Sequence, residues 1–87
     1  MILNLPNEKQ LKLLIEIHKK NFITANFRCD FYYNYSSLFK ALENLIEKGW
    51  IIKDKNQLNE NVYYLSNNGI NILVVIGYLD KFQFRLY

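Results

Sequence analysis

Residues 34–52, with the sequence NYSSLFKALENLIEKGWII, constrain the fold of this chain more than any other segment. In a helix, spacings of three and four residues gather four apolar side chains on one side: Leu38, Leu42, Leu45 and Ile46. The opposite side then carries small polar and charged residues: Ser36, Ser37, Lys40, Asn44 and Glu47. Asn34 suits the N-cap, because its side-chain oxygen accepts a first-turn N–H, and Gly49 readily adopts the left-handed conformation that ends helices. The segment therefore predicts a helix over residues 35–48 with one buried side.

An apolar run follows this helix directly and predicts a β-hairpin. Residues 50–55 and 61–65 have the composition of strands. The polar segment 56–60 between them lacks glycine, so we expect a longer loop rather than a two-residue turn. A helix with a polar face that leads straight into a hairpin indicates a DNA recognition helix followed by a wing.

The N-terminal region predicts another amphipathic helix, over residues 8–20. Asn7 and Gln10 form a capping-box pattern at its start, and Pro6 precedes it where a missing N–H does no harm. His18 lies on the side of this helix that faces inward, where a lone histidine usually has a structural role.

Between these two helices the sequence predicts a very short strand at residues 22–23 and a helix over residues 25–32. Thr24 is placed to cap that helix. Phe27 and Phe31, four residues apart, would face inward from it. Aromatic residues favour helices only weakly, so this helix has the least local support.

A last helix begins at Ser66, is predicted to run to about residue 82, and is apolar on nearly all sides. One stripe consists of Ile70, Leu73, Val74, Gly77 and Tyr78. The other consists of Ile72, Val75, Ile76, Leu79 and Phe82. One side can lie on the chain's own core and the other needs a cover, so we expect a homodimer through this helix. We assign the first stripe to the interface, with the second as the alternative. The chain is then a single domain over residues 1–87, and its segment 66–87 is the dimerisation helix and tail.

Composition narrows the class of protein. The chain has 87 residues, enough for one small domain, and 51% of them are hydrophobic, which excludes a disordered or low-complexity chain. A net charge of +3 permits nucleic-acid binding but is only mildly basic. Cys29 is the only cysteine, which rules out an intrachain disulfide and favours a reducing, intracellular compartment. We expect neither a secretion signal nor a membrane span, since the apolar run at residues 70–79 is about half the length that a bilayer needs.

Catalytic chemistry has little support in the sequence. His18 and Cys29 lie in different predicted elements, and no nucleophile elbow or glycine-rich phosphate loop surrounds them. Residues that ligate metals do not cluster along the chain. We therefore expect a binding protein rather than an enzyme, with no metal, cofactor or small-molecule ligand.

Residues 36–51, SSLFKALENLIEKGWI, resemble the recognition helix of winged-helix regulators of the MarR and PadR type. Those proteins typically have a Ser/Thr-rich start, L-x-x-x-L-x-x-L spacing, and an acidic-Lys-Gly end followed by two apolar residues. Residues 63–69, YYLSNNG, resemble the Y-x-L-T-x-x-G transition from the wing to the last helix. The match spans about residues 23–73. It implies a winged helix-turn-helix, a mainly α fold with a small β-hairpin (α+β), in the order α-β-α-α-β-β-α.

The resemblance also implies a dimer that sets its two recognition helices in successive major grooves, with the wings at the flanking minor grooves. Small dimeric proteins of this type are similar to those common in archaea and their viruses. Three features depart from the family pattern. Arg28 stands where a small residue usually packs between two helices, and the wing has Glu60 and Asn61 where a basic residue is common. Glu43 and Glu47 flank the side that would face DNA.

The candidate DNA contacts come from the helix and from the wing. The helix supplies Ser36, Ser37, Lys40 and Asn44. The wing supplies Lys53, Lys55, Asn56, Gln57 and Asn59. Lysine can contact phosphates or guanine, and asparagine can contact adenine. The wing would reach the DNA backbone or the minor groove. Both sets of residues also fit an ordinary solvated surface.

Two further residues have two interpretations each. Tyr35 either contacts a phosphate or closes the edge of the core. Arg28 either clamps a phosphate or covers apolar surface with its stem. We expect the remaining aromatic cluster to be core: Phe27, Phe31, Phe39 and Trp50.

The leading hypothesis from the sequence is a sequence-specific, double-stranded DNA-binding protein that regulates transcription as a homodimer and represses by occupying its site. We expect it in the cytoplasm, or in the host cytoplasm if the source is a virus. The alternative is a protein–protein adaptor on the same fold, which the mild charge and acidic flanks favour. DNA binding would weaken steeply with salt and fail on Lys40→Glu, whereas adaptor binding would tolerate both.

Overall fold

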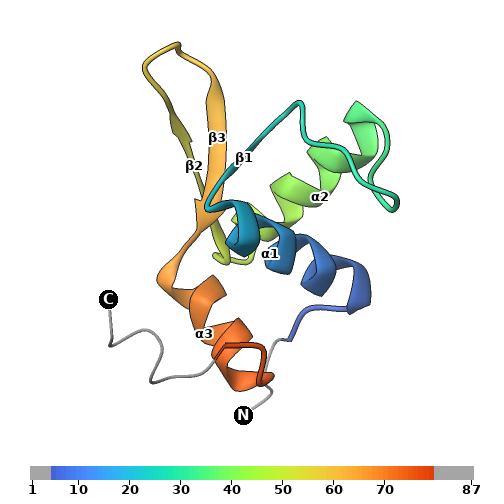
Figure 1. The fold of residues 1–87 in the computed structure, drawn as a ribbon, viewed down its shortest axis with the longest axis vertical. Helices are drawn as coiled ribbons and strands as arrows, with labels where there is room; N and C mark the ends of the chain where they lie inside the picture. The colour runs from blue at the N-terminus through green and yellow to red at the C-terminus, as the bar shows by residue number, and fades with distance from the viewer. Residues whose placement is uncertain (1–4, 80–87) are drawn as a thin grey trace.

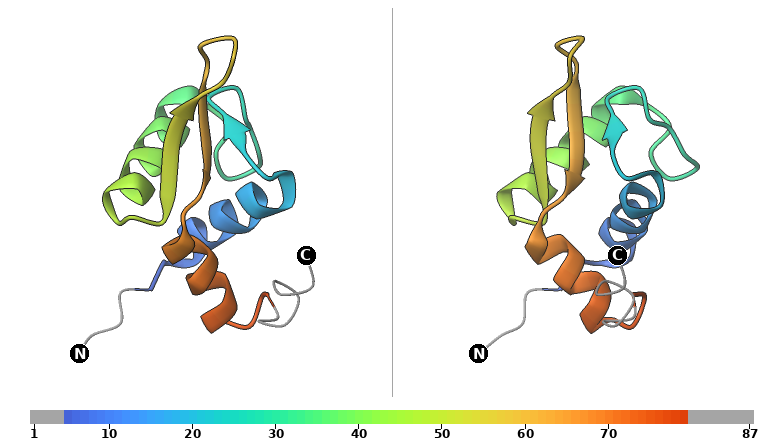
Figure 2. Two further views of the ribbon diagram at one scale, coloured as in Figure 1. Left: turned by 90° about the vertical axis from the view of Figure 1, so that its left-hand side faces the viewer. Right: turned by 60° about the vertical axis from the view of Figure 1, so that its left-hand side comes forward.

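The structure, a computed structural model, describes residues 5–79 and has a small α+β fold (Figure 1). Its elements are α1 (Glu8–Lys20), β1 (Ile23–Thr24), α2 (Tyr35–Glu47), β2 (Ile51–Lys55), β3 (Asn61–Leu65) and α3 (Asn67–Val75). The three strands form an antiparallel sheet in the order β1-β3-β2. The β2–β3 hairpin projects at one end of the molecule and α3 lies at the other (Figures 1 and 2). None of these helices is long and apolar enough to cross a membrane.

The first two helices begin at the caps that the sequence predicts. Asn7 Oδ1 accepts the N–H of Gln10 at 2.9 Å, and Gln10 Oε1 accepts the N–H of Asn7 at 2.9 Å. This reciprocal pair satisfies two backbone donors that a helix start leaves without partners. At the start of α2, Asn34 Oδ1 accepts the N–H of Ser37 at 2.9 Å. Both predicted N-caps are confirmed.

The end of α2 is set by Gly49, as predicted. Gly49 has φ +79°, and its N–H donates to Ile46 O at 2.9 Å. The Trp50 N–H donates to Leu45 O at 3.0 Å. This pair of bonds is the Schellman arrangement, which needs a residue tolerant of positive φ at the position of Gly49. It turns the chain directly from α2 into the buried Trp50 and the first strand of the hairpin.

The core lies between one face of the sheet and the helices. Ile23 pairs with Tyr63 across β1 and β3, and Ile51 pairs with Leu65 across β2 and β3. Strand side chains alternate between the two faces, so these register positions put Ile23, Tyr63 and Ile51 on the inner face. The buried apolar residues are Leu13, Leu14, Ile17, Ile23, Tyr32, Leu38, Leu42, Leu45, Trp50, Ile51, Tyr63 and Leu73.

The helix predicted over residues 25–32 is wrong, because this segment is a loop. The N–H of Cys29 donates to Tyr32 O at 3.2 Å, and the N–H of Tyr32 donates to Cys29 O at 3.1 Å. These two bonds close a tight turn over residues 30–31. Thr24 Oγ1 accepts the N–H of Asn26 at 3.3 Å and so supports a turn rather than a helix.

Aromatic rings of this loop lie beneath lysines of α1. Lys9 Nζ is 5.4 Å from the ring centroid of Tyr32, and Lys12 Nζ is 5.7 Å from that of Phe31. A further contact joins the start of the loop to the end of α1, where Lys20 Nζ is 6.0 Å from the centroid of Phe27. Such contacts stabilise by about 0.5–1 kcal/mol each at exposed sites. They compensate for the absent helix by anchoring the loop along α1.

The last helix is shorter than predicted. Ser66 caps it, since its Oγ accepts the Gly69 N–H at 3.1 Å, but α3 ends at Val75. The N–H of Gly77 donates to Val74 O at 3.0 Å, and Gly77 has φ +88°. The N–H of the next residue donates to Leu73 O at 2.9 Å, which completes a second Schellman ending. The prediction of a helix through residues 76–79 is therefore wrong, and residues 80–82 lie outside the described residues.

Candidate nucleic-acid interface

Helix α2 has the buried side and the polar side that the sequence predicts. Leu38, Leu42 and Leu45 are buried in the core. On the outside, Ser36, Lys40, Glu43, Asn44 and Glu47 are exposed. Position along the helix separates their charges, because Lys40 lies in the first half and both glutamates lie in the second. The first half of α2 is therefore the part that suits an anionic partner.

Three of the predicted contact residues line one hollow between α1 and α2. Its volume is about 290 Å³, and its lining is Asn7, Lys9, Gln10, Tyr32, Ser37, Lys40, Ala41 and Asn44. The hollow brings Ser37, Lys40 and Asn44 together with the first turn of α1. No role in binding was predicted for Lys9 or Gln10, because their proximity to Lys40 arises only from the packing of the two helices.

The flank of α2 that faces the hairpin is aromatic. The rings of Tyr35 and Phe39 stack at 5.9 Å between centroids, with 20° between their planes. Phe39 is 43% exposed, so its assignment to the core is wrong, whereas Trp50 is buried as expected. The other two predicted core aromatics, Phe27 and Phe31, are partly buried against the core.

Tyr63 lies in the core behind this aromatic flank. Together with Ala25 and residues of α2, among them Tyr35 and Phe39, it lines a narrow crevice between the sheet and α2. Burial raises the pKa of the Tyr63 hydroxyl, and the Glu43 carboxylate and Tyr35 raise it further. The tyrosine is therefore held neutral next to the acidic half of α2.

The lysines of the hairpin lie on the sheet face that packs against α2. Lys53 pairs with Tyr63, and Lys55 pairs with Asn61, whereas Ile52 pairs with Tyr64 on the opposite face. Both lysines are exposed. The Lys55 ammonium also reaches the carbonyl of Asn59 at 3.5 Å. The hairpin thus adds two positive charges on the side of the sheet where α2 lies.

The hairpin tip is a five-residue loop, as predicted, and Asn56 organises it. Asn56 Oδ1 accepts the N–H groups of Leu58 and Glu60, both at 2.9 Å. Its Nδ2 donates to Glu60 Oε1 at 3.0 Å. Asn59 has φ +64°, a conformation that asparagine tolerates better than most residues. Asn56 is therefore committed to the turn, while Gln57 and Asn59 are exposed at its end.

Arg28 belongs to the loop rather than to a helix. Its Nη1 donates to the carbonyls of Ala25 and Phe27, both at 2.7 Å. These charge-assisted bonds hold the turn that follows β1. The structure therefore gives Arg28 a local structural role and does not bring it into the hollow that contains Lys40.

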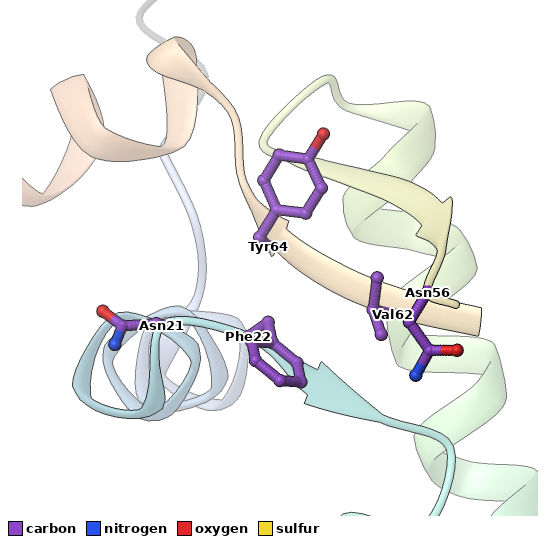
Figure 3. Close-up of a pocket in the computed structure, with 5 residues that line it drawn as sticks. All are labelled: Asn21, Phe22, Asn56, Val62 and Tyr64. Carbon is purple, nitrogen blue, oxygen red and sulfur yellow. The ribbon is translucent and has the colours of Figure 1, made fainter. Parts of the chain in front are cut away.

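The outer face of the sheet carries a second hollow of about 290 Å³ (Figure 3). Its lining is Asn21, Phe22, Asn56, Val62 and Tyr64. Phe22 is 51% exposed, and Ile52 on the same face is 41% exposed. This face is accessible and largely apolar, although Asp54 of β2 also lies on it. The hollow was not predicted from the sequence, because Phe22 comes to it from just before β1.

The predicted dimer stripe of α3 does not form one surface. Leu73 is fully buried in the core, so its assignment to a dimer interface is wrong. Gly77 follows the helix and forms its ending, Ile70 and Val74 are partly buried, and Tyr78 is exposed. The most exposed apolar residues at this end are Val75, Ile76 and Tyr78, which come from both predicted stripes.

His18 and Cys29 do not form a shared site. His18 meets the ring of Tyr78 edge-on at 5.9 Å, and its Nδ1 is buried without a hydrogen-bond partner among residues 5–79. Cys29 is a partly buried free thiol in the loop. Over the same residues, no three histidine, cysteine, aspartate or glutamate side chains gather in a way that could hold a metal ion.

A comparison with models of known protein families finds no match to this chain, and no curated protein matches it.

Proposed function

We propose that this protein binds double-stranded DNA, with α2 as its recognition helix and the β2–β3 hairpin as a wing. The observation that carries the proposal is the division of α2 into a leucine side within the core and a polar side with Ser36, Ser37 and Lys40. A helix of 13 residues is about 20 Å long and fits the major groove of B-DNA. The sheet order β1-β3-β2 and the direct passage from α2 into the hairpin support a winged-helix arrangement, in which loop 25–34 replaces the second helix.

The charges indicate how DNA lies on this surface. Lys40 in the first half of α2 would approach a phosphate or a guanine edge, and Asn44 would read an adenine. Glu43 and Glu47 lie in the second half of α2, which would rise out of the groove. This position would keep their carboxylates away from the phosphates, whose repulsion would otherwise weaken binding. Lys53 lies on the sheet face towards α2 and would reach the flanking backbone.

We further propose that the protein acts inside the cell as a homodimeric repressor that occupies its operator. Val75, Ile76 and Tyr78 at the end of α3 support self-association, because they expose apolar side chains next to one another in sequence. Two copies related by a two-fold axis would present two α2 helices to successive major grooves.

A charge reversal at Lys40 tests the proposal. Binding of a fluorescent duplex is measured by anisotropy for the wild type, for Lys40→Glu and for Lys19→Glu. Lys19→Glu makes the same charge change on α1. Lys19 lies outside the α1–α2 hollow and pairs with Glu16. Loss of one phosphate contact lowers affinity about eightfold at about 0.1 M salt, and repulsion by the new carboxylate lowers it further.

Unfolding curves of the two variants establish that each is folded. Equal affinity of Lys40→Glu and Lys19→Glu would contradict the assignment of α2 as the DNA-contacting helix.

The second candidate function is a protein–protein adaptor, which the apolar outer face of the sheet favours. Phe22, which lines the hollow in Figure 3, exposes a large side chain there, and so does Ile52 elsewhere on the same face. A partner that docks on this face would bind in a salt-tolerant manner and would be indifferent to Lys40→Glu. Retained partner binding in Lys40→Glu, together with its loss in Phe22→Ser, would support the adaptor against DNA binding.

A further inference from the structure

The hollow between α1 and α2 has the composition of an anion site. Of the described residues that line it, two are lysines, five are polar or aromatic with a hydrogen-bonding group, and none is acidic. Neither Lys9 nor Lys40 has a carboxylate within ion-pair distance among residues 5–79, where the two ion pairs join Lys12 to Glu8 and Lys19 to Glu16. Both positive charges are therefore available to a partner.

The α1 side of the hollow adds to this positive potential. Asn7, Lys9 and Gln10 lie at the start of α1, where the helix dipole has its positive end. Glu8 of the same turn does not line the hollow and pairs with Lys12 instead. A lysine at this end is unfavourable for the isolated helix, since its charge opposes the dipole. An anion in the hollow would be stabilised both by the charge of Lys9 and by the positive end of the α1 dipole.

Lys9 is also held in position for a contact. Its Nζ lies 5.4 Å from the ring centroid of Tyr32, which lines the same hollow. A cation–π contact restricts the side chain without neutralising its charge. The Gln10 side chain uses Oε1 to accept the Asn7 N–H, and this leaves its amide as a donor towards the hollow.

The opposite flank of α2 contributes no positive charge of its own. Phe39 and Tyr35 cover it with stacked rings, and Glu43 lies close enough to Tyr63 to raise its pKa. A phosphate directly beside α2 is therefore favoured on the α1 side, whereas on the other side the positive charges come from the hairpin lysines Lys53 and Lys55.

We propose that the α1–α2 hollow receives a phosphate of the DNA backbone, and that Lys9 of α1 contacts this phosphate together with Lys40. The inference rests on the proposed function, and it adds α1 to the interface. One strand of the duplex whose major groove holds α2 passes over the first turn of α1, so the N-terminal helix fixes the angle at which α2 enters the groove. Phosphate contacts of this kind set orientation and carry no sequence preference.

The test is a salt titration of duplex binding for Lys9→Ala, Lys9→Arg and the matched control Lys19→Ala. We expect Lys9→Ala to lose about eightfold in affinity at about 0.1 M salt and to reduce the slope of log K against log salt by about 0.9. The loss is the same for specific and random duplexes. Lys9→Arg keeps the wild-type slope, and so does Lys19→Ala. Unfolding midpoints, followed through Trp50 fluorescence, establish that all variants are folded.

The outcomes separate the two proposals. If the wild type binds DNA and Lys40→Glu weakens binding as expected, but Lys9→Ala has the wild-type affinity and slope, then DNA does not pass over α1. The inference is then overturned while the proposed function stands. If the wild type does not bind any duplex at low salt, both are overturned.

Discussion

Gly69→Ala is a sensitive test of how the hairpin joins α3. A Cβ at this position would lie 2.1 Å from the carbonyl oxygen of Trp50 and 3.3 Å from Leu65 Cδ2. Contacts below 3.0 Å essentially never occur, so the backbone of Trp50 or of α3 must move by about 0.9 Å or more. The same carbonyl accepts the N–H of Ser66 at 3.0 Å, and a shift would weaken this hydrogen bond as well.

The expected change in the free energy of unfolding combines two destabilising contributions and one stabilising contribution. Overpacking of a rigid site costs about 1–3 kcal/mol, and a weakened hydrogen bond about 1 kcal/mol more. Replacement of glycine by alanine within a helix returns about 1 kcal/mol. The net destabilisation is about 2 kcal/mol, which lowers the melting temperature of a domain of this size by about 10 °C.

Urea unfolding measures this effect. Trp50 is the single tryptophan of the chain and is buried, so its fluorescence reports unfolding, while circular dichroism provides a second probe that is less local. Asn71→Ala is the matched control, because it changes an exposed position of the same helix. A midpoint for Gly69→Ala equal to that of Asn71→Ala would refute the close approach of α3 to Trp50.

Two further predictions concern the core and self-association. Burial raises the pKa of Tyr63, so the folded state retains this proton above pH 10, and stability falls as the pH rises from 10 through the raised pKa. Tyr63→Phe should reduce that alkaline loss, by no more than about 1.4 kcal/mol per pH unit, and an alkaline stability profile equal to that of the wild type would count against this. Val75 is 62% exposed at the end of α3. Under the proposed homodimer, Val75→Glu should yield monomers in sedimentation velocity, while Asn71→Glu should keep the oligomeric state of the wild type. Dimers of unchanged strength in Val75→Glu would exclude this end of α3 from the interface.

Local interactions explain why much of the fold could be predicted from the sequence. The caps at Asn7, Asn34 and Ser66 each bond a backbone N–H three residues ahead, so their role is encoded within a few positions. The ending at Gly49 is equally local. The hairpin could be predicted for the same reason, since its polar five-residue loop separates two apolar runs.

The segment between β1 and α2 could not be predicted from local pattern. Phe27 and Phe31 have helical spacing, but their rings lie under lysines of α1, and the turn at Cys29 uses the backbone bonds that a helix would need. Contacts with another element decide this conformation. The helix propensity of aromatic residues is too weak to compete with them.

The candidate site was predictable in its α2 part and in the hairpin lysines Lys53 and Lys55, but not in its α1 part. Ser36, Ser37 and Lys40 follow from the leucine spacing, because a helix with one buried side must expose the other. Phe39 was expected in the core as part of an aromatic cluster, although it lies at the margin of the apolar stripe and is 43% exposed. The contribution of Lys9 depends on how α1 crosses α2, and no spacing within either helix encodes that.

Helix α3 shows the limit of periodicity for an element that is apolar all round. Both stripes satisfied the helical spacing, so the pattern could not decide that Leu73 faces the core. Gly77 fitted a stripe equally well, but its positive φ serves the helix ending. Which side is buried depends on the rest of the fold, and here the approach of Gly69 to Trp50 fixes the rotation of the helix.

Titration of a random AT-rich duplex with the pure wild-type protein, followed by fluorescence anisotropy at low and at physiological salt, tests the central claim most directly. We expect micromolar binding at low salt that weakens steeply as salt rises. Each neutralised phosphate adds about 0.9 to the slope of log K against log salt concentration. Absence of binding at low salt, or binding that does not respond to salt, would contradict the assignment of α2 and the hairpin as a DNA interface.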